Sequence, residues 1–127
     1  MTKESFTSWL EKLKMAWEGK NPEGAPNLCA ENFIWYETPF TDPIKTKENL
    51  LEEWKTISDH ENIQFSYKIL SVNQNIGFAH WSAAFTRIST KENVEMDGVF
   101  MVKLDDKGLC MEFHQWYNIR DESTTKG

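Results

Sequence analysis

The chain has 127 residues, the usual size of one domain and too few for two ordinary domains. Its 14 Lys and Arg against 20 Asp and Glu give a formal net charge of -6, and arginine is rare, so we expect no nucleic-acid partner. The longest purely apolar stretch, residues 99–102, is far too short for a membrane span, and the first residues lack the apolar core of a signal peptide, so we expect a cytoplasmic protein with no membrane partner.

Aromatic residues make up 13% of the chain, with six Trp and eight Phe, which is high for a chain of this size. Such content predicts that aromatic side chains surround a large, flat molecule. The two cysteines, Cys29 and Cys110, are too few for a disulfide framework, and we expect them to be buried free thiols. No glycine loop that could cradle a phosphate is present, so the sequence implies no organic cofactor.

The first half of the chain predicts helices and one strand. Apolar residues recur at helical spacing over residues 6–17, with Thr2 as a suitable cap and an end near Gly19. A proline at the first helical position predicts a short helical piece from Asn21. Residues 33–37 are aromatic and β-branched and predict a strand.

Thr46 then predicts the start of a third helix, with an apolar stripe formed by Leu50, Leu51, Trp54 and Ile57. Beyond it, apolar residues alternate with period two, and turn signals separate four runs. These runs are residues 62–72, 76–88, 94–104 and 109–118. Helices followed by a meander predict an α+β fold in which the N-terminal helices pack on the concave face of a curved mixed or antiparallel sheet. We expect one domain over residues 1–122 and a C-terminal tail over 123–127.

Placing Leu104 opposite Leu109 in the last hairpin sets a register for the sheet. The predicted rows are Trp81–Phe100–Phe113, Ala83–Gly98–Gln115 and Phe85–Met96–Tyr117. The middle row has two nearly absent side chains beside one polar side chain, which predicts a hollow between aromatic walls. The alternative is that Ala83 and Gly98 only make room for a helix.

The opposite face of the predicted sheet is half polar and half apolar. It carries His80, Ser82, Asp97, Val99, Met101, Glu112, His114 and Trp116. No three of its possible ligands converge in the predicted register, so we expect no metal site. An apolar patch of this kind favours contact with a second subunit, and we expect a homodimer through this face. A shift of one residue in the strand 76–88 would instead turn His80 and Ser82 toward the interior.

Glu37 is the candidate catalytic residue. Strand alternation places it on the same face as Trp35, where burial would raise the pKa of its carboxyl toward the range of a general acid or base. A donor such as Tyr67, Tyr117 or Gln115 would oppose that shift. The alternative is an exposed carboxylate at the end of the strand. The candidate ligand-binding residues are Trp35, Trp54, Tyr67, Trp81, Phe100, Phe113, Gln115 and Tyr117, although burial in a core also explains the tryptophans.

The order of the predicted elements and the segment 29–39, Cys-Ala-Glu-Asn-Phe-Ile-Trp-Tyr-Glu-Thr-Pro, resemble the SnoaL-like branch of the nuclear transport factor 2 superfamily. Residues 46–50, 97–100 and 113–117 match further parts of the pattern, so the resemblance covers nearly the whole chain. It implies a cone-shaped α+β barrel with an open-ended pocket, often in a dimer. The family includes steroid isomerases, polyketide cyclases, epoxide hydrolases and members without known activity, so the fold alone fixes no function.

The resemblance also implies roles for single positions. Glu37 falls where the ketosteroid isomerases that this chain resembles place an aspartate base, whereas their oxyanion-hole tyrosine and acid correspond to Leu13 and Phe100. In the comparison with epoxide hydrolases, the catalytic aspartates correspond to Ala83 and Gln115. The implied function is therefore binding of a small, largely apolar molecule with one polar handle. Glu37 would be the acid or base of an isomerase, cyclase or hydrolase; the alternative is a non-catalytic binding or dimeric interaction module.

Overall fold

A computed structural model describes residues 1–121 of the chain. Its elements are α1 (Lys3–Glu18), α2 (Gly24–Asn27), β1 (Cys29–Tyr36), α3 (Lys47–Trp54), the 3₁₀ helix η1 (Lys55–Asp59), β2 (His60–Asn73), β3 (Ile76–Arg87), β4 (Asn93–Leu104) and β5 (Cys110–Asp121). The predicted tail at 123–127 and the predicted domain limit at residue 122 lie outside the described residues. None of the helices in the described part is long and apolar enough to cross a membrane.

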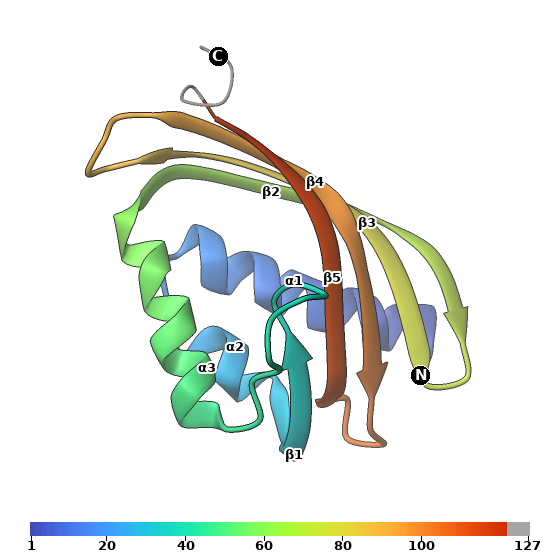
Figure 1. The fold of residues 1–127 in the computed structure, drawn as a ribbon. Helices are drawn as coiled ribbons and strands as arrows, with labels where there is room; N and C mark the ends of the chain where they lie inside the picture. Colours follow the sequence, from blue (N-terminus) through green and yellow to red (C-terminus); the bar gives the residue numbers. More distant parts are fainter. Residues whose placement is uncertain (122–127) are drawn as a thin grey trace.

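The strands form one five-stranded sheet in the order β1-β5-β4-β3-β2. β1 runs parallel to β5, and the other neighbours are antiparallel. Figure 1 shows this sheet arching over the helices, so that α1 and α3 lie on its concave side. The predicted α+β class, the mixed curved sheet and the helices on its concave face are confirmed.

Side-chain caps fix where two of the helices begin. The Thr2 hydroxyl accepts a hydrogen bond from the Ser5 backbone N–H at 3.0 Å, and the Ser5 hydroxyl accepts one from the Thr2 N–H at 2.9 Å. This reciprocal pair is a capping box. Thr46 caps α3 by accepting from the Asn49 N–H at 3.1 Å. Both predicted caps are confirmed, whereas β1 begins at Cys29, four residues before the predicted strand.

The register between β4 and β5 differs from the predicted one. Leu104 pairs with Cys110 rather than with Leu109, and a bulge beside this pair inserts a further residue into β5. Phe100 therefore pairs with Gln115, two residues away from its predicted partner. A shift of two residues keeps every side chain on its predicted face, so the faces are correct and the rows are wrong.

The hollow predicted over the row Ala83–Gly98–Gln115 is also wrong. Gly98 lies between Trp81 and Tyr117 in the sheet. A Cβ atom at Gly98 would lie 2.2 Å from the Trp116 carbonyl oxygen and 2.7 Å from the Tyr117 Cβ atom. The glycine is required because the backbone of β5 approaches β4 closely there, and it does not form the floor of a cavity.

Stacked aromatic rings form the centre of the core. Trp35 lies against Phe113 with ring centroids 3.8 Å apart, and Trp81 lies against Phe100 with centroids 4.9 Å apart. The three largest fully buried side chains are Trp9, Trp35 and Trp81. The predicted free thiols are also buried. The interior is thus built largely from flat aromatic rings packed against one another.

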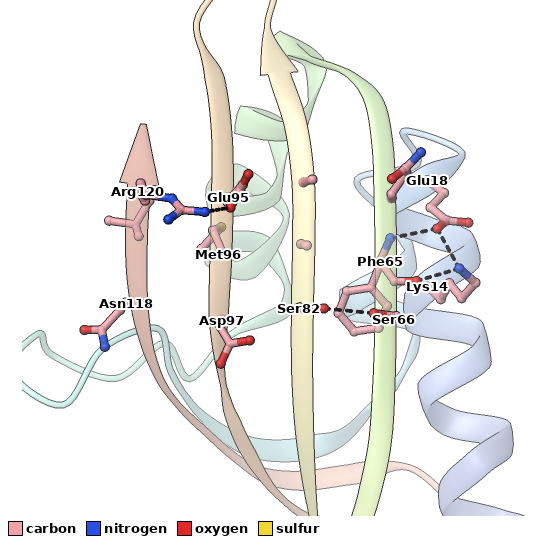
Figure 2. A pocket seen from close by; sticks show the side chains of 14 residues that line it. Lys14, Glu18, Phe65, Ser66, Ser82, Glu95, Met96, Asp97, Asn118 and Arg120 are labelled. Carbon is pink, nitrogen blue, oxygen red and sulfur yellow. Dashed lines mark hydrogen bonds and ion pairs between the residues drawn. The ribbon is translucent and has the colours of Figure 1, made fainter. Parts of the chain in front are cut away.

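Two side chains of α1 bond to the backbone of β2, the edge strand of the sheet, at Phe65. The Lys14 ammonium donates to the Phe65 carbonyl oxygen at 2.6 Å, and the Phe65 N–H donates to a Glu18 carboxylate oxygen at 2.9 Å. Figure 2 shows both contacts beside the strand. These bonds occupy backbone groups that an edge strand would otherwise offer to another chain.

Candidate functional site

A cavity of about 250 Å³ lies between the concave face of the sheet and the helices α1 and α3. Residues of α1, β1, α3, η1, β3, β4 and β5 form its wall, together with the first residue of β2, and α2 contributes none. The lining residues are Leu13, Trp17, Trp35, Glu37, Glu53, Trp54, Thr56, Ile57, His60, Trp81, Phe85, Arg87, Met96, Phe100, Phe113, Gln115, Tyr117 and Ile119. Most are aromatic or aliphatic, with a few polar groups among them, which is the usual character of a small-molecule site.

Glu37 follows directly after β1, and both of its carboxylate oxygens are held by donors. The Trp35 indole N–H donates to one oxygen at 2.7 Å. The Gln115 side-chain amide donates to the other oxygen at 2.9 Å and also to the Glu37 carbonyl oxygen at 2.9 Å. Gln115 therefore fixes the carboxyl and its backbone together, and the acid has a defined position on the cavity wall.

Burial raises the pKa of Glu37 to about 7 from an ordinary value of 4.5. The hydrogen bonds from Trp35 and Gln115 act in the opposite direction, and the nearby carboxylate of Glu53 adds to the increase. Burial has the larger effect on the pKa because the carboxylate loses more stabilisation when water is removed than the two neutral N–H donors supply. Glu37 is therefore present in both protonation states near neutral pH.

His60 is a second polar group on the wall that the sequence reasoning missed. Its Nδ1 accepts a hydrogen bond from the Trp17 indole N–H at 3.1 Å, and its ring stacks on Phe85 with centroids 3.8 Å apart. Burial lowers the pKa of His60 to about 4, so the ring is neutral at pH 7. A bulge near Asn62, which has a φ of 55°, inserts a residue into β2 and turns His60 inward against the alternation read from Phe65.

The structure brings most of the predicted site residues together. Besides Glu37, those on the cavity wall are Trp35, Trp54, Trp81, Phe100, Phe113, Gln115 and Tyr117. The predicted placement of Tyr67 in the site is wrong. Its hydroxyl donates to a Glu11 carboxylate oxygen at 2.5 Å, because this part of β2 lies under α1. The donor that opposes the pKa shift of Glu37 is therefore Gln115, together with Trp35, and not Tyr67.

His80 and Ser82 lie on the outer face, since the residues between and beside them, Ala79, Trp81 and Ala83, are buried. The one-residue shift that would turn them inward does not occur. His80 Nε2 lies 2.9 Å from an Asp97 carboxylate oxygen, and a similar pair joins His114 to Glu112. Within residues 1–121, no group of three or more His, Cys, Asp or Glu side chains is arranged to hold a metal ion.

A larger hollow of about 700 Å³ lies on the outer face near the ends of β4 and β5. Figure 2 shows that its polar side chains bond to one another: Arg120 to Glu95, Ser66 to Ser82, and Lys14 to Glu18. It is wide open to solvent and its labelled charges are mostly neutralised by neighbours, so it offers little desolvation to a ligand. The cavity beside Glu37 is less open and has a mostly aromatic and aliphatic wall, so it is the candidate site.

Three kinds of comparison place the chain among known proteins. The model of the SnoaL-like domain matches residues 9–113. None of the curated proteins is a match. The Δ5-3-ketosteroid isomerase from Mycobacterium sp. has the same fold, with a TM-score of 0.78, 14% identity, and coverage of 92% of this chain and 98% of that chain.

Two further solved structures are also similar. A computationally designed 17-OHP binder has a TM-score of 0.76 and 19% identity, with 91% of this chain and 95% of that chain covered. SalBIII, an epoxide hydrolase/cyclase-like enzyme in pyran ring formation in salinomycin, has a TM-score of 0.75 and 14% identity, with 92% of each chain covered. At these identities the structures establish the fold, and the matched domain establishes the family. The chain belongs to the SnoaL-like family of the nuclear transport factor 2-like superfamily.

Proposed function

We propose that the cavity binds a small, largely apolar molecule with one polar group, and that Glu37 moves a proton on it without a cofactor. The reaction would be of the isomerase, cyclase or hydrolase type. The observation that carries the proposal is a carboxyl fixed on the wall of an aromatic cavity, whose burial raises its pKa to about 7. A group with this pKa can both take and return a proton at neutral pH.

The surroundings of Glu37 suit proton transfer to or from a bound molecule. The donors Trp35 and Gln115 hold the carboxyl in one orientation, so little reorganisation is needed before the proton moves. In an isomerisation the carboxylate would take a proton from one atom of the substrate and return it to another, which needs no further reactant. The apolar walls would exclude water and keep the proton between the two partners.

The second candidate function is ligand binding without catalysis. Leu13 and Phe100 lie on the cavity wall at the positions that the resemblance assigns to an oxyanion hole, and neither side chain can donate a hydrogen bond. An enolate formed by Glu37 would thus lack the donors that ketosteroid isomerases use. This observation favours a reaction with little build-up of charge, or binding alone.

Glu37→Gln separates the two functions. The variant removes the titrating group at nearly constant shape, so we expect ligand binding to persist, measured by tryptophan fluorescence. On a substrate found by screening cyclic ketones and epoxides, turnover should fall by about 10²- to 10⁴-fold. Glu95→Gln is the matched control, because it removes an exposed carboxylate of the outer face, outside the cavity, and should keep turnover. Unchanged turnover in Glu37→Gln would remove Glu37 from the reaction and leave the binding function.

We also propose that the chain is a cytoplasmic homodimer that associates through the outer face of its sheet. Two adjacent rows of that face run through Tyr36, His114, Met101 and Phe78, and through Trp116, Val99 and His80, and they end in β2 at Ser71 and Lys68. The Trp116 side chain is 44% exposed and stacks beside His114. The two histidines pair with carboxylates on the same face, which leaves an apolar patch with few free charges. A second copy of the same patch would cover it by two-fold symmetry.

A further inference from the structure

Cys29 and Cys110, the two cysteines of the chain, lie opposite each other in the sheet. They are the first residues of β1 and β5 and are register partners in that parallel pair of strands. Both are free thiols, and both side chains are 0% exposed. Neither residue lines the cavity beside Glu37, so the pair lies outside the chemistry proposed for that cavity.

The backbone geometry at this pair suits a disulfide. Neighbouring strands lie about 4.8 Å apart, and the Cα atoms that a disulfide joins are about 4.4–6.8 Å apart. Register partners direct their side chains to the same face of a sheet, which at Cys29 and Cys110 is a buried face. The backbone therefore needs little movement to bring the two sulfur atoms to bonding distance.

The two thiols already contact each other. The Cys29 thiol donates a hydrogen bond to the Ala25 carbonyl oxygen, with 3.4 Å between the two heavy atoms. The Cys29 sulfur thus remains available as an acceptor. Burial first, and then the hydrogen bond between the two thiols, raises the pKa of the Cys110 thiol. The hydrogen bond requires that the two sulfur atoms face each other.

The start of β1 has few other bonds to β5. Beyond the cysteine pair the register is broken, and pairing resumes at Ile34 and Glu112. Next to the pair, the Cys110 N–H donates to the Leu28 carbonyl oxygen at 2.8 Å. A covalent bond between the cysteines would hold the start of β1 on β5 ahead of this break in the register.

The thiols lie close to the surface in the chain. Leu28 and Leu109, the residues directly before each cysteine, line an outer hollow of about 560 Å³ beside α1 and α2. Local opening at the start of β1, where the register is broken, would expose both thiols to a small disulfide such as oxidised glutathione.

We propose that Cys29 and Cys110 form an intramolecular disulfide when the chain meets a disulfide oxidant such as oxidised glutathione. One cysteine thiolate attacks the oxidant, releases one glutathione and forms a mixed disulfide; the other thiolate then attacks the cysteine sulfur of that bond and releases the second glutathione. The cysteines lose two electrons and two protons, and the oxidant gains them as two thiols. The new bond closes a loop of about 80 residues and joins the two strands that place Glu37 and Gln115.

The test is the equilibrium of the full chain with fixed mixtures of reduced and oxidised glutathione, at urea concentrations through the unfolding transition. Each mixture is approached from the reduced and from the oxidised chain and is quenched with acid. Mass spectrometry then measures the fraction of chains that have lost two hydrogens, which gives the effective concentration of one thiol at the other. Because the fold holds the thiols together, we expect this concentration to be about 10²- to 10³-fold higher in the folded than in the unfolded chain.

The same linkage predicts that the oxidised chain unfolds at a higher urea concentration than the reduced chain. Cys110→Ala is the control, because it keeps Cys29 and can form only a mixed disulfide. Oxidation should not raise the urea concentration at which this variant unfolds.

An effective concentration that is equal or lower in the folded chain would overturn the proposal, because the fold would then hold the sulfur atoms apart or strain the bond. Products that consist only of mixed disulfides or of two linked chains would also overturn it. The unmodified chain decides between these results even where Cys110→Ala does not fold. The proposed function of the cavity is tested separately, because the cysteines do not line it.

Discussion

At the scale of single residues, the balance of burial against hydrogen bonding sets the pKa of Glu37. The carboxyl has two donors and still has its pKa raised to about 7, because the apolar wall removes most of its hydration. Strand alternation from Trp35 could predict that Glu37 faces inward, and Gln115 could be predicted as a donor. The size of the shift could not be predicted, because it depends on how completely α3 and the sheet enclose the carboxyl.

This shift makes the stability of the fold depend on pH. The pKa of Glu37 is about 7 in the folded chain against 4.5 ordinarily, so the folded state binds an extra proton between these values. The stabilisation is complete below about pH 4.5 and is lost as the pH rises through about 7, a change of about 3 kcal/mol. As the pH rises from below 4.5 to above 7, we expect the free energy of unfolding, measured in urea, to fall by about 3 kcal/mol more in the unmodified chain than in Glu37→Gln.

The effect of Glu37 is isolated by the difference in the free energy of unfolding between the unmodified chain and Glu37→Gln at each pH. His60 acts in the opposite direction, because its pKa is lowered to about 4 and its contribution to stability is lost as the pH falls below its ordinary value of 6.5. That contribution is common to both proteins and cancels in the difference. Parallel curves for the two proteins across the whole range would show that Glu37 titrates like an exposed residue.

The thiols give a second prediction at this scale. Cys29 and Cys110 pair across β1 and β5, and burial, followed by the neighbouring Cys29, raises the pKa of the Cys110 thiol. Because the thiolate is the reactive form, we expect neither cysteine to react with Ellman's reagent in the folded chain. Both should react once urea unfolds it. Rapid labelling of the folded chain would contradict the burial of this pair.

At the scale of elements, Gly98 shows how closely β4 and β5 approach. Replacing it with alanine places a methyl group 2.2 Å from the Trp116 carbonyl oxygen, so the strands must move apart. We expect Gly98→Ala to lower the free energy of unfolding by about 1–3 kcal/mol, measured by urea denaturation. Glu95→Ala, an exposed change in the same strand, should cost about 1 kcal/mol or less. Equal stability of Gly98→Ala and the unmodified chain would contradict the close approach.

Helix starts, strand positions and strand faces could be predicted from local chemistry. Thr2 and Thr46 carry the hydroxyl groups that cap α1 and α3, and alternation fixes which side chains of β3 face inward. The register could not be predicted. The bulge between β4 and β5 has no local signal in the sequence, and β3 pairs with β4 two residues away from the predicted rows, with Trp81 opposite Gly98, although no bulge interrupts that pair of strands. A bulge depends on the pairing of two strands, and a pattern read along one strand does not contain it.

At the scale of the whole molecule, the cavity results from the joint placement of residues far apart in the chain. Glu37 meets Gln115 across 78 positions, and Trp17 meets His60 across 43. The resemblance of the sequence to a known family predicted a cavity beside Glu37. It could not predict that Tyr67 leaves the site for Glu11, or that a bulge brings His60 in, because both depend on contacts of this chain alone.

The proposed dimer is tested on the outer face. Trp116→Glu places a charge in the apolar patch, and we expect it to produce monomers in sedimentation velocity where the unmodified chain forms dimers. Met15→Glu is the control, because Met15 is 70% exposed on α1, away from the patch. Its dimer should remain. A Trp116→Glu protein that sediments as the same dimer would place the interface elsewhere.

The central claim is that Glu37 is a desolvated carboxyl on the wall of a ligand cavity. The most direct measurement is the pKa of Glu37 from a carbon-detected NMR titration of its side-chain carboxyl in the full chain, with Glu37→Gln to assign the signal. We expect a pKa of about 7. A value at or below the ordinary 4.5 would contradict the account, because it would mean that water or the hydrogen bonds from Trp35 and Gln115 keep the carboxyl ionised at neutral pH.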